Sequence, residues 1–200
     1  DNVGAYLLTD MSHYSGLIAG GVYDNPVEHS DFVTSTTHKT LRGARGGMIL
    51  WNNPDLTKKI NGGIFPGTQG GPLMNQMAGK VQSYYEANTD EFKQYTQNVI
   101  DNAKTMCEVF RENGIKIQTD GTDCHMVLIH TKKTSGKEIA NLLEEKDKIV
   151  VNKNSVPNDE RSVWNTSGIR IGTAAMTTKK GLNERYFQTI AQKISERINE

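Results

Sequence analysis

The sequence lacks the features that mark several classes of protein. Only two of its 200 residues are cysteines, too few for the disulfide scaffold of a small secreted domain. No apolar run approaches the roughly 20 residues that a helix needs to span a bilayer. Lys and Arg together number 23, as do Asp and Glu, so there is no general basic surface for nucleic acid. We therefore expect a cytoplasmic protein, with an organellar location left open, that binds neither nucleic acid nor membranes.

The first half of the sequence alternates short apolar runs with helical segments, which predicts an α/β sheet domain. The run over 4–9 is typical of a buried parallel strand that ends at Asp10. Further strands are expected over 31–35 and 46–51, a short helix or turn over 11–21, and helices over 55–61 and 73–87.

The second half predicts a smaller α+β domain reached through one long helix. Thr89 is a good N-cap for this helix, an apolar stripe follows at spacings of three and four, and Gly114 ends it. Ser135 and Glu138 form a capping box that predicts a helix to about Lys146. Strands are expected over 115–119, 125–130, 149–151 and 168–172, with a closing helix over 182–198. We place the domain boundary between residues 87 and 88.

Two charged residues suggest a covalent cofactor site. Asp10 ends one predicted strand, and Lys39 follows the end of the next among hydroxyl side chains. If these strands are neighbours, both residues face one crevice at the carboxyl end of the sheet. A lysine that forms a Schiff base, with an aspartate that holds a ring nitrogen protonated, is the protein's part of pyridoxal phosphate (PLP) chemistry. On spacing alone, a basic loop on a polar surface is the stronger interpretation.

Longer sequence motifs favour the cofactor site over the basic surface loop. The segments TDMSHYSGLIAGG (9–21), TTHKTLRGARGG (36–47), FPGTQGGP (65–72), VNKNSVPND (151–159) and TSGIRIGT (166–173) occur in the order and form of one family. They resemble serine hydroxymethyltransferase over roughly the second half of that family's chain. The resemblance implies the later part of a PLP fold-type-I large domain, with a mostly parallel sheet, followed by a smaller α+β domain. It also implies PLP-dependent interconversion of serine and glycine, with one-carbon transfer to tetrahydrofolate as co-substrate.

The resemblance assigns the cofactor contacts residue by residue. Lys39 matches the lysine that holds PLP as a Schiff base, and Asp10 matches the partner of the pyridine nitrogen. His13 matches a histidine near the phenolic oxygen of PLP, and His38 matches a residue that contacts the phosphate. Arg45 matches an arginine beside the active-site lysine.

Further matches concern catalysis, the subunit contact and the substrates. Thr36 is grouped with Lys39 and His13 as a candidate catalytic residue, and Gly70 and Gly71 match a loop that reaches the neighbouring subunit's phosphate. Arg170 matches the arginine that clamps the amino-acid carboxylate. The positions that match folate contacts are Asn154, Ser162, Val163 and Trp164, where Val163-Trp164 departs from the family's usual Pro-Phe. The resemblance thus implies a homodimer or a dimer of dimers with shared active sites.

Two alternatives to this interpretation stay open. The chain could be a catalytically incomplete binding or assembly module, or its site could perform folate-independent aldol cleavage of 3-hydroxy amino acids.

No metal site is expected, because the adjacent Cys124 and His125 lack the spacing of metal ligands. Since the matched region is about half of the family's length, we expect part of a longer protein or one half of a split enzyme. We also expect an unpaired sheet edge that makes this chain fold poorly by itself.

Overall fold

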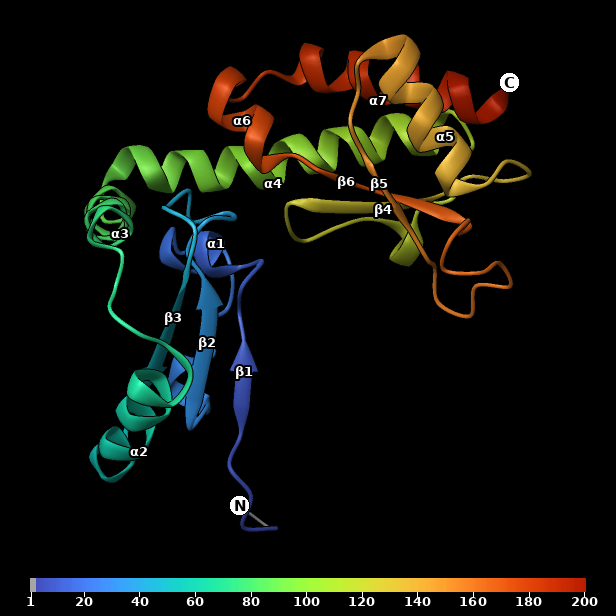
Figure 1. Ribbon diagram of the computed structural model, residues 1–200. Helices are drawn as coiled ribbons and strands as arrows, with labels where there is room; N and C mark the ends of the chain where they lie inside the picture. Colours follow the sequence, from blue (N-terminus) through green and yellow to red (C-terminus); the bar gives the residue numbers. More distant parts are fainter. Residues whose placement is uncertain (1–2) are drawn as a thin grey trace. The chain divides into compact units, whose positions relative to one another are not determined.

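The computed structural model describes residues 3–200 and shows a mixed α/β protein with helices and two small sheets (Figure 1). The chain divides into two compact units, Asp1–Thr96 and Gln97–Glu200. Helix α4 (Asp90–Glu112) begins in the first unit and ends in the second. Within residues 3–200, no helix combines the length and apolar character needed to cross a membrane.

The sheet of the first unit has three strands in the order β1-β2-β3: Leu8–Asp10, Phe32–Thr36 and Gly47–Trp51. Strands β1 and β2 are parallel, with Asp10 opposite Thr34, whereas β2 and β3 are antiparallel. One pairing is therefore parallel and one antiparallel, so the expectation of a mostly parallel sheet is not confirmed in this part of the sheet. Parallel neighbours need a crossover of a dozen or more residues. Residues 37–46 instead form a loop that turns back on itself, with Thr37 N–H donating to Gly46 O (3.0 Å).

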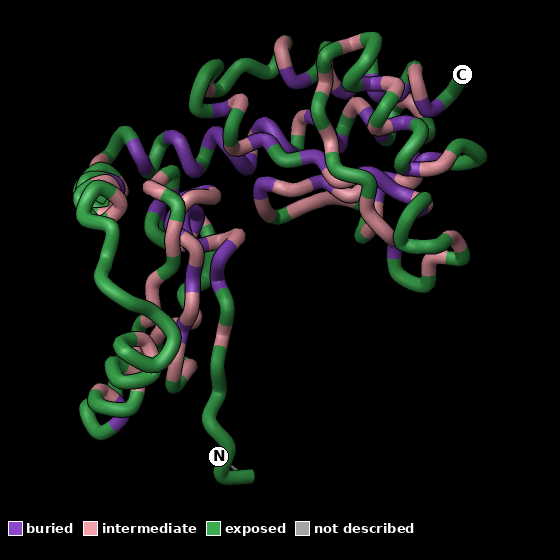
Figure 2. The backbone as a smooth tube through the Cα atoms, viewed as in Figure 1, coloured by how far each residue is buried: buried purple, intermediate pink, exposed green. Residues whose placement is uncertain are grey.

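Strand β1 is an exposed edge rather than the buried strand predicted over 4–9. The side chains of Tyr6, Leu7 and Leu8 are 65%, 54% and 58% exposed. Figure 2 shows the described chain before β1 as exposed, and residues 3–8 are all in this class. The apolar run is present, but only β2 pairs with β1, so nothing in the described chain covers its other side.

The helices of the first unit agree with the expected positions. They are α1 (Ser15–Ala19), α2 (Thr57–Gly62) and α3 (Met74–Ala87), with short turns η1 (Val27–His29), η2 (Pro54–Leu56) and η3 (Gly63–Thr68). The predicted cap of α4 is confirmed, because Thr89 Oγ1 accepts a hydrogen bond from Phe92 N–H (3.2 Å). The predicted stop is also confirmed: Gly114 has a φ of 65°, a conformation that glycine adopts without steric cost.

The second unit packs helices around an antiparallel sheet in the order β4-β6-β5: Met126–His130, Gly168–Gly172 and Asn152–Asn154. Its remaining elements are η4 (Gln118–Asp120), α5 (Gly136–Leu142), η5 (Leu143–Asp147), α6 (Ala174–Lys180) and α7 (Glu184–Asn199). The capping box at Ser135 and Glu138 is confirmed. Apolar side chains from the C-terminal part of α4, the sheet, α5 and α7 form one buried core, which includes Phe110, Ile129, Ile169 and Ile194.

Two strands predicted in this unit are wrong. Ile115 and Ile117 are buried, but the segment 115–119 makes only the single bridge between Ile117 and Ile129. Thr119, at a φ of 65°, ends the extended backbone, so the apolar alternation reports core contact rather than a strand. The strand predicted over 149–151 begins later, at β5. The preceding helix ends at Lys148, which has a φ of 58°, and the N–H of Ile149 still donates to Leu143 O at this helix end.

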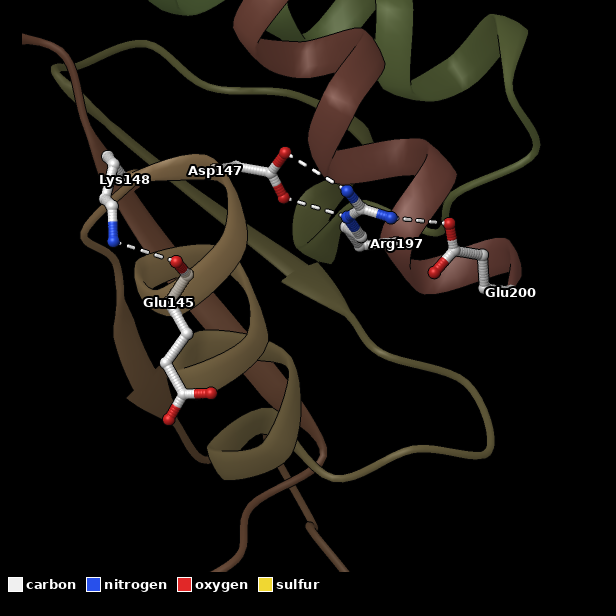
Figure 3. A network of polar contacts seen from close by, with 5 residues as sticks. All are labelled: Glu145, Asp147, Lys148, Arg197 and Glu200. Atoms are coloured by element: carbon white, nitrogen blue, oxygen red, sulfur yellow. Dashed lines mark hydrogen bonds and ion pairs between the residues drawn. The ribbon is translucent and has the colours of Figure 1, made fainter.

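An ion-pair network joins η5 to the end of α7 (Figure 3). The guanidinium of Arg197 donates to both carboxylate oxygens of Asp147, at 2.8 and 3.2 Å, and to Glu200 at 2.7 Å. The hydrogen bonds from Arg197 hold the pKa of Asp147 below its usual range. Because the pairing is bidentate, it fixes the geometry as well as neutralising charge.

Candidate active site

Asp10 occupies the carboxyl end of β1 as an ionised hydrogen-bond acceptor. Its carboxylate accepts bonds from Thr34 Oγ1 (2.7 Å), Ser12 N–H (3.1 Å) and Ser12 Oγ (3.1 Å). Partial burial raises the pKa of Asp10, but the bonds from Thr34 and Ser12 and the charge of Lys39 outweigh it and leave the pKa below its ordinary value. Asp10 is therefore held in the form that can stabilise a neighbouring positive charge.

Lys39 lies in the loop that follows β2 and is half-buried. Within residues 3–200, its amine makes no hydrogen bond to another residue, although its charge acts on Asp10. The parallel register of β1 and β2 explains this proximity, because both strands end at the same edge of the sheet. The expectation that Asp10 and Lys39 lie at one edge of the sheet therefore agrees with the register of β1 and β2.

The residue after Lys39 is locked in place by buried contacts. Thr40 is 1% exposed, and its hydroxyl donates to His13 O (2.8 Å) and accepts from Gly16 N–H (3.0 Å). Its carbonyl accepts a hydrogen bond from Tyr95 Oη (3.2 Å) at the start of α4. Helix α1 and the first turns of α4 thus set the backbone position from which Lys39 projects.

Replacing Gly16 with alanine is expected to destabilise the first unit by roughly 3 kcal/mol, because the core has no room for a methyl group there. An added Cβ would lie 2.2 Å from the carbonyl carbon of Thr40 and 2.6 Å from Leu41 N. Urea unfolding of the variant measures the loss. Gly62→Ala is the matched control, since nothing lies within 4 Å of a Cβ at that position. Equal stability of the two variants would contradict the close packing of α1 on the Lys39 loop.

Arg42 is a second anchor of this loop that the sequence did not reveal. Its backbone has a φ of 60°, and its guanidinium lies 4.0 Å from the ring centre of Tyr95 and 5.2 Å from that of Phe92. Such cation–π contacts contribute about 0.5–2 kcal/mol each. The sequence could not predict these contacts, because the rings lie some fifty residues further along the chain.

His38 and Arg45 face each other across the same loop. Arg45 Nη1 lies 3.1 Å from His38 Nε2, and Gly46 N–H lies 3.4 Å from His38 Nδ1. A neutral imidazole has only one accepting nitrogen, so these two contacts are alternatives. The tautomer of His38 therefore decides whether its ring accepts from Arg45 or from Gly46.

A groove of about 970 Å³ in the first unit joins the Lys39 loop to the glycine-rich loop before α3. Its lining includes Arg45, Gly46, Gly70, Gly71 and Lys80. Nothing lies within 4 Å of an added Cβ at Gly70 or Gly71, so their backbone is open to a partner, and Lys80 Nζ donates to Gly47 O (3.0 Å). Basic side chains beside glycine backbone are a donor set that fits a phosphate group. The sequence analysis did not predict a role for Lys80, because it lies outside the matched motifs.

Thr36 contributes to the structure of the strand end. Its backbone N–H donates to Ser12 Oγ (3.0 Å), and its hydroxyl donates to Ser12 O (3.2 Å). Ser12 in turn donates to Asp10, so a short chain of hydrogen bonds runs from Thr36 through Ser12 to the carboxylate.

The second unit places Arg170 at the centre of its sheet. Arg170 lies on β6 opposite Leu128 of β4 and Asn152 of β5, and its side chain is half-buried. Asn154, at the end of β5, pairs with Gly168, and its side-chain amide donates to Ser155 O (2.7 Å). A rigid middle strand is a suitable platform for a planar guanidinium that binds a carboxylate.

The remaining candidates lie in the β5–β6 loop, residues 155–167. Ser162 is exposed, and Val163 and Trp164 are 70% and 75% exposed. Lys153 Nζ donates to the carbonyls of Val163 (2.9 Å) and Trp164 (3.0 Å) and lies 5.5 Å from the centre of the indole ring. The apolar loop tip is thus held in an ordered position although it is exposed.

Comparison with known proteins decides the family. A family model described as serine hydroxymethyltransferase matches residues 1–194. The chain belongs to the serine hydroxymethyltransferase family. A serine hydroxymethyltransferase of Mesoplasma florum is 49% identical over 203 residues, which cover 100% of this chain and 48% of the relative.

Two further relatives named serine hydroxymethyltransferase give the same result. The protein of Teredinibacter turnerae is 53% identical over 182 residues, which cover 90% of this chain and 43% of the relative. The protein of Wolbachia pipientis is 49% identical over 200 residues, which cover 99% of this chain and 47% of the relative. The resemblance inferred from the motifs is therefore confirmed, and the chain spans about half the length of the curated relatives it matches.

Proposed function

We propose that this chain contributes the lysine-bearing part of a PLP-dependent serine hydroxymethyltransferase, which interconverts serine and glycine and transfers a one-carbon unit to tetrahydrofolate. The observation that carries the proposal is the placement of Lys39 beside an ionised Asp10 at the ends of two parallel strands. Because the chain belongs to the serine hydroxymethyltransferase family, we interpret this pair as the Schiff-base lysine and the partner of the pyridine nitrogen.

The candidate cofactor-binding residues of the first unit would then each contact PLP in this chain or in the neighbouring subunit. When bound, PLP would supply an electron sink for the α-carbon of the substrate. Lys39 would hold PLP as a Schiff base, and the Asp10 carboxylate would keep the pyridine nitrogen protonated. His13 would lie near the phenolic oxygen. His38 and Arg45 would bind the phosphate of this chain's cofactor. The backbone N–H groups of Gly70 and Gly71 would donate to the phosphate in the neighbouring subunit.

The second unit would bind the substrates. Arg170 would hold the amino-acid carboxylate through two parallel hydrogen bonds. Asn154 and the loop tip at Ser162, Val163 and Trp164 would contact tetrahydrofolate. The larger arrangement that we propose is the later part of a fold-type-I large domain over 1–87 and a small α+β domain over 88–200.

We also propose that the protein acts in the cytoplasm as a homodimer or dimer of dimers. Helix α3 and the residue before it expose Leu73, Met74, Val81 and Tyr85 at 69%, 70%, 64% and 76%. Apolar surface of this extent is typical of a face that another polypeptide covers. Gly70 and Gly71 lie next to it, which suits a glycine loop that contributes to a partner's site.

The test of the proposed function is spectroscopic and chemical. The protein titrated with PLP should develop a yellow absorbance band, and glycine should shift it. Conversion of serine to glycine should require tetrahydrofolate. Turnover of 3-hydroxy amino acids without any effect of tetrahydrofolate would instead favour the aldol-cleavage alternative. An enzyme that contains this chain together with the rest of the active site and stays colourless with PLP would contradict the proposal.

A further inference from the structure

The β5–β6 loop is longer than its two strands require. Strands β5 and β6 are antiparallel neighbours, which a connection of two to five residues can join, yet residues 155–167 lie between them. Loops of this length with no regular structure are uncommon in compact domains and are often functional. Such a loop needs internal bonds if its tip is to hold one position.

One carboxylate provides these bonds. Asp159 Oδ2 accepts from Val156 N–H (3.2 Å) and Ser167 N–H (2.8 Å). Its Oδ1 accepts from Arg161 N–H (2.9 Å) and Ser167 Oγ (2.6 Å). Asp159 thus ties the beginning of the loop to its last residue. The bond from Ser167 is the main reason why the pKa of Asp159 lies well below its usual range, so the group stays ionised.

The bonded base of the loop is also attached to the rest of the unit. Arg161 Nη1 donates to Thr134 O (2.7 Å), and its Nη2 donates to Lys133 O (2.5 Å). Ser167 O accepts from Thr131 N–H (2.9 Å). The base therefore rests on the turn between β4 and α5, while Lys153 holds the tip.

We infer that Asp159 is a positioning residue that closes the base of the β5–β6 loop and so presents Ser162, Val163 and Trp164 in a fixed geometry to the folate co-substrate. This inference rests on the proposed function. Asp159 lies in the loop base and acts through the loop rather than by touching the ligand. Ordering the loop before binding removes an entropy cost that the ligand would otherwise bear.

Asp159→Asn tests the inference because it preserves volume and removes one acceptor. An amide nitrogen only donates, so whichever way the amide turns, at least one backbone N–H of the loop loses its acceptor. We expect the KM for tetrahydrofolate to rise roughly tenfold, the scale of one lost charge-assisted hydrogen bond. PLP affinity and the glycine-induced spectral shift should stay within about twofold, because Arg170 is held by the β4–β6–β5 ladder.

Asp147→Asn is the matched control, because Asp147 is another ionised carboxylate of the same unit that accepts two bonds, from Arg197 on α7 (Figure 3). It should leave the KM for tetrahydrofolate unchanged. Ser167→Ala removes only the Oγ bond and should give a smaller rise than Asp159→Asn, which keeps the test usable if Asp159→Asn folds poorly. Hydrogen exchange of the amides over 155–167 should speed up in Asp159→Asn and not in Asp147→Asn.

The outcomes separate the inference from the proposed function. A KM for tetrahydrofolate that matches the Asp147→Asn value overturns the inference, as does a parallel loss of PLP, glycine and folate binding. A wild-type protein that shows no tetrahydrofolate-dependent turnover overturns the proposed function. Unchanged hydrogen exchange over 155–167 in Asp159→Asn overturns the ordering role whatever the activity.

Discussion

Lys39→Ala is expected to abolish the yellow absorbance band that the wild-type protein forms with PLP and to lower serine turnover by at least about 10³-fold. The reason is chemical, because alanine has no amine to form the Schiff base. The loop itself should persist, since Thr40, Tyr95 and Arg42 hold it through contacts that do not involve the Lys39 amine. Absorbance with added PLP and steady-state assays measure the two effects.

Lys58→Ala is the control for the Lys39 variant. Lys58 is an exposed lysine of α2, so its loss removes the same charge from the same unit without touching the Lys39 loop. It should keep the band and the turnover. A Lys39→Ala protein that retains the band and its response to glycine would show that another amine carries the cofactor.

Arg170→Ala is expected to weaken glycine and serine binding by about 1.5–3 kcal/mol, or roughly ten- to a hundredfold, the scale of a lost hydrogen-bonded charge pair. PLP affinity should persist, because the proposed cofactor contacts all belong to the first unit. Titration of the spectral shift with glycine measures the change. Arg170→Lys should recover only part of the loss, since an ammonium keeps the charge but cannot form the two parallel bonds of a guanidinium.

Arg185→Ala controls for loss of positive charge in the second unit, because Arg185 is exposed on α7. It should bind glycine as the wild type does. An Arg170→Ala variant that loses PLP and glycine affinity to the same extent would instead assign Arg170 a role in folding.

The elements that sequence predicted well are those with local signals. The apolar stripe of α4, its cap at Thr89 and the capping box at Ser135 all depend on residues within four positions of each other. The strand-end position of Asp10 likewise followed from a short apolar run and its boundary. These signals need no knowledge of the distant chain, which explains why the structure reproduces them.

The failures have long-range causes. The 4–9 run is apolar as a buried strand should be, yet its exposure depends on what lies beyond the sheet edge. The 115–119 alternation reports burial against the core without pairing, and β3 runs antiparallel because of how the 37–46 loop folds. Arg42 and Asp159 lie within the matched motifs, but their roles were not predicted, because those roles come from partners that only the folded chain brings near.

Reduction of the PLP-loaded protein with borohydride, followed by proteolysis and mass spectrometry, tests the central claim most directly. Reduction converts a Schiff base into a stable secondary amine, so the pyridoxyl group marks the lysine that held it. The account predicts one modified peptide with the group on Lys39 and loss of that peptide in Lys39→Ala. Modification of a different lysine, or of none, would contradict the assignment of Lys39 as the cofactor lysine.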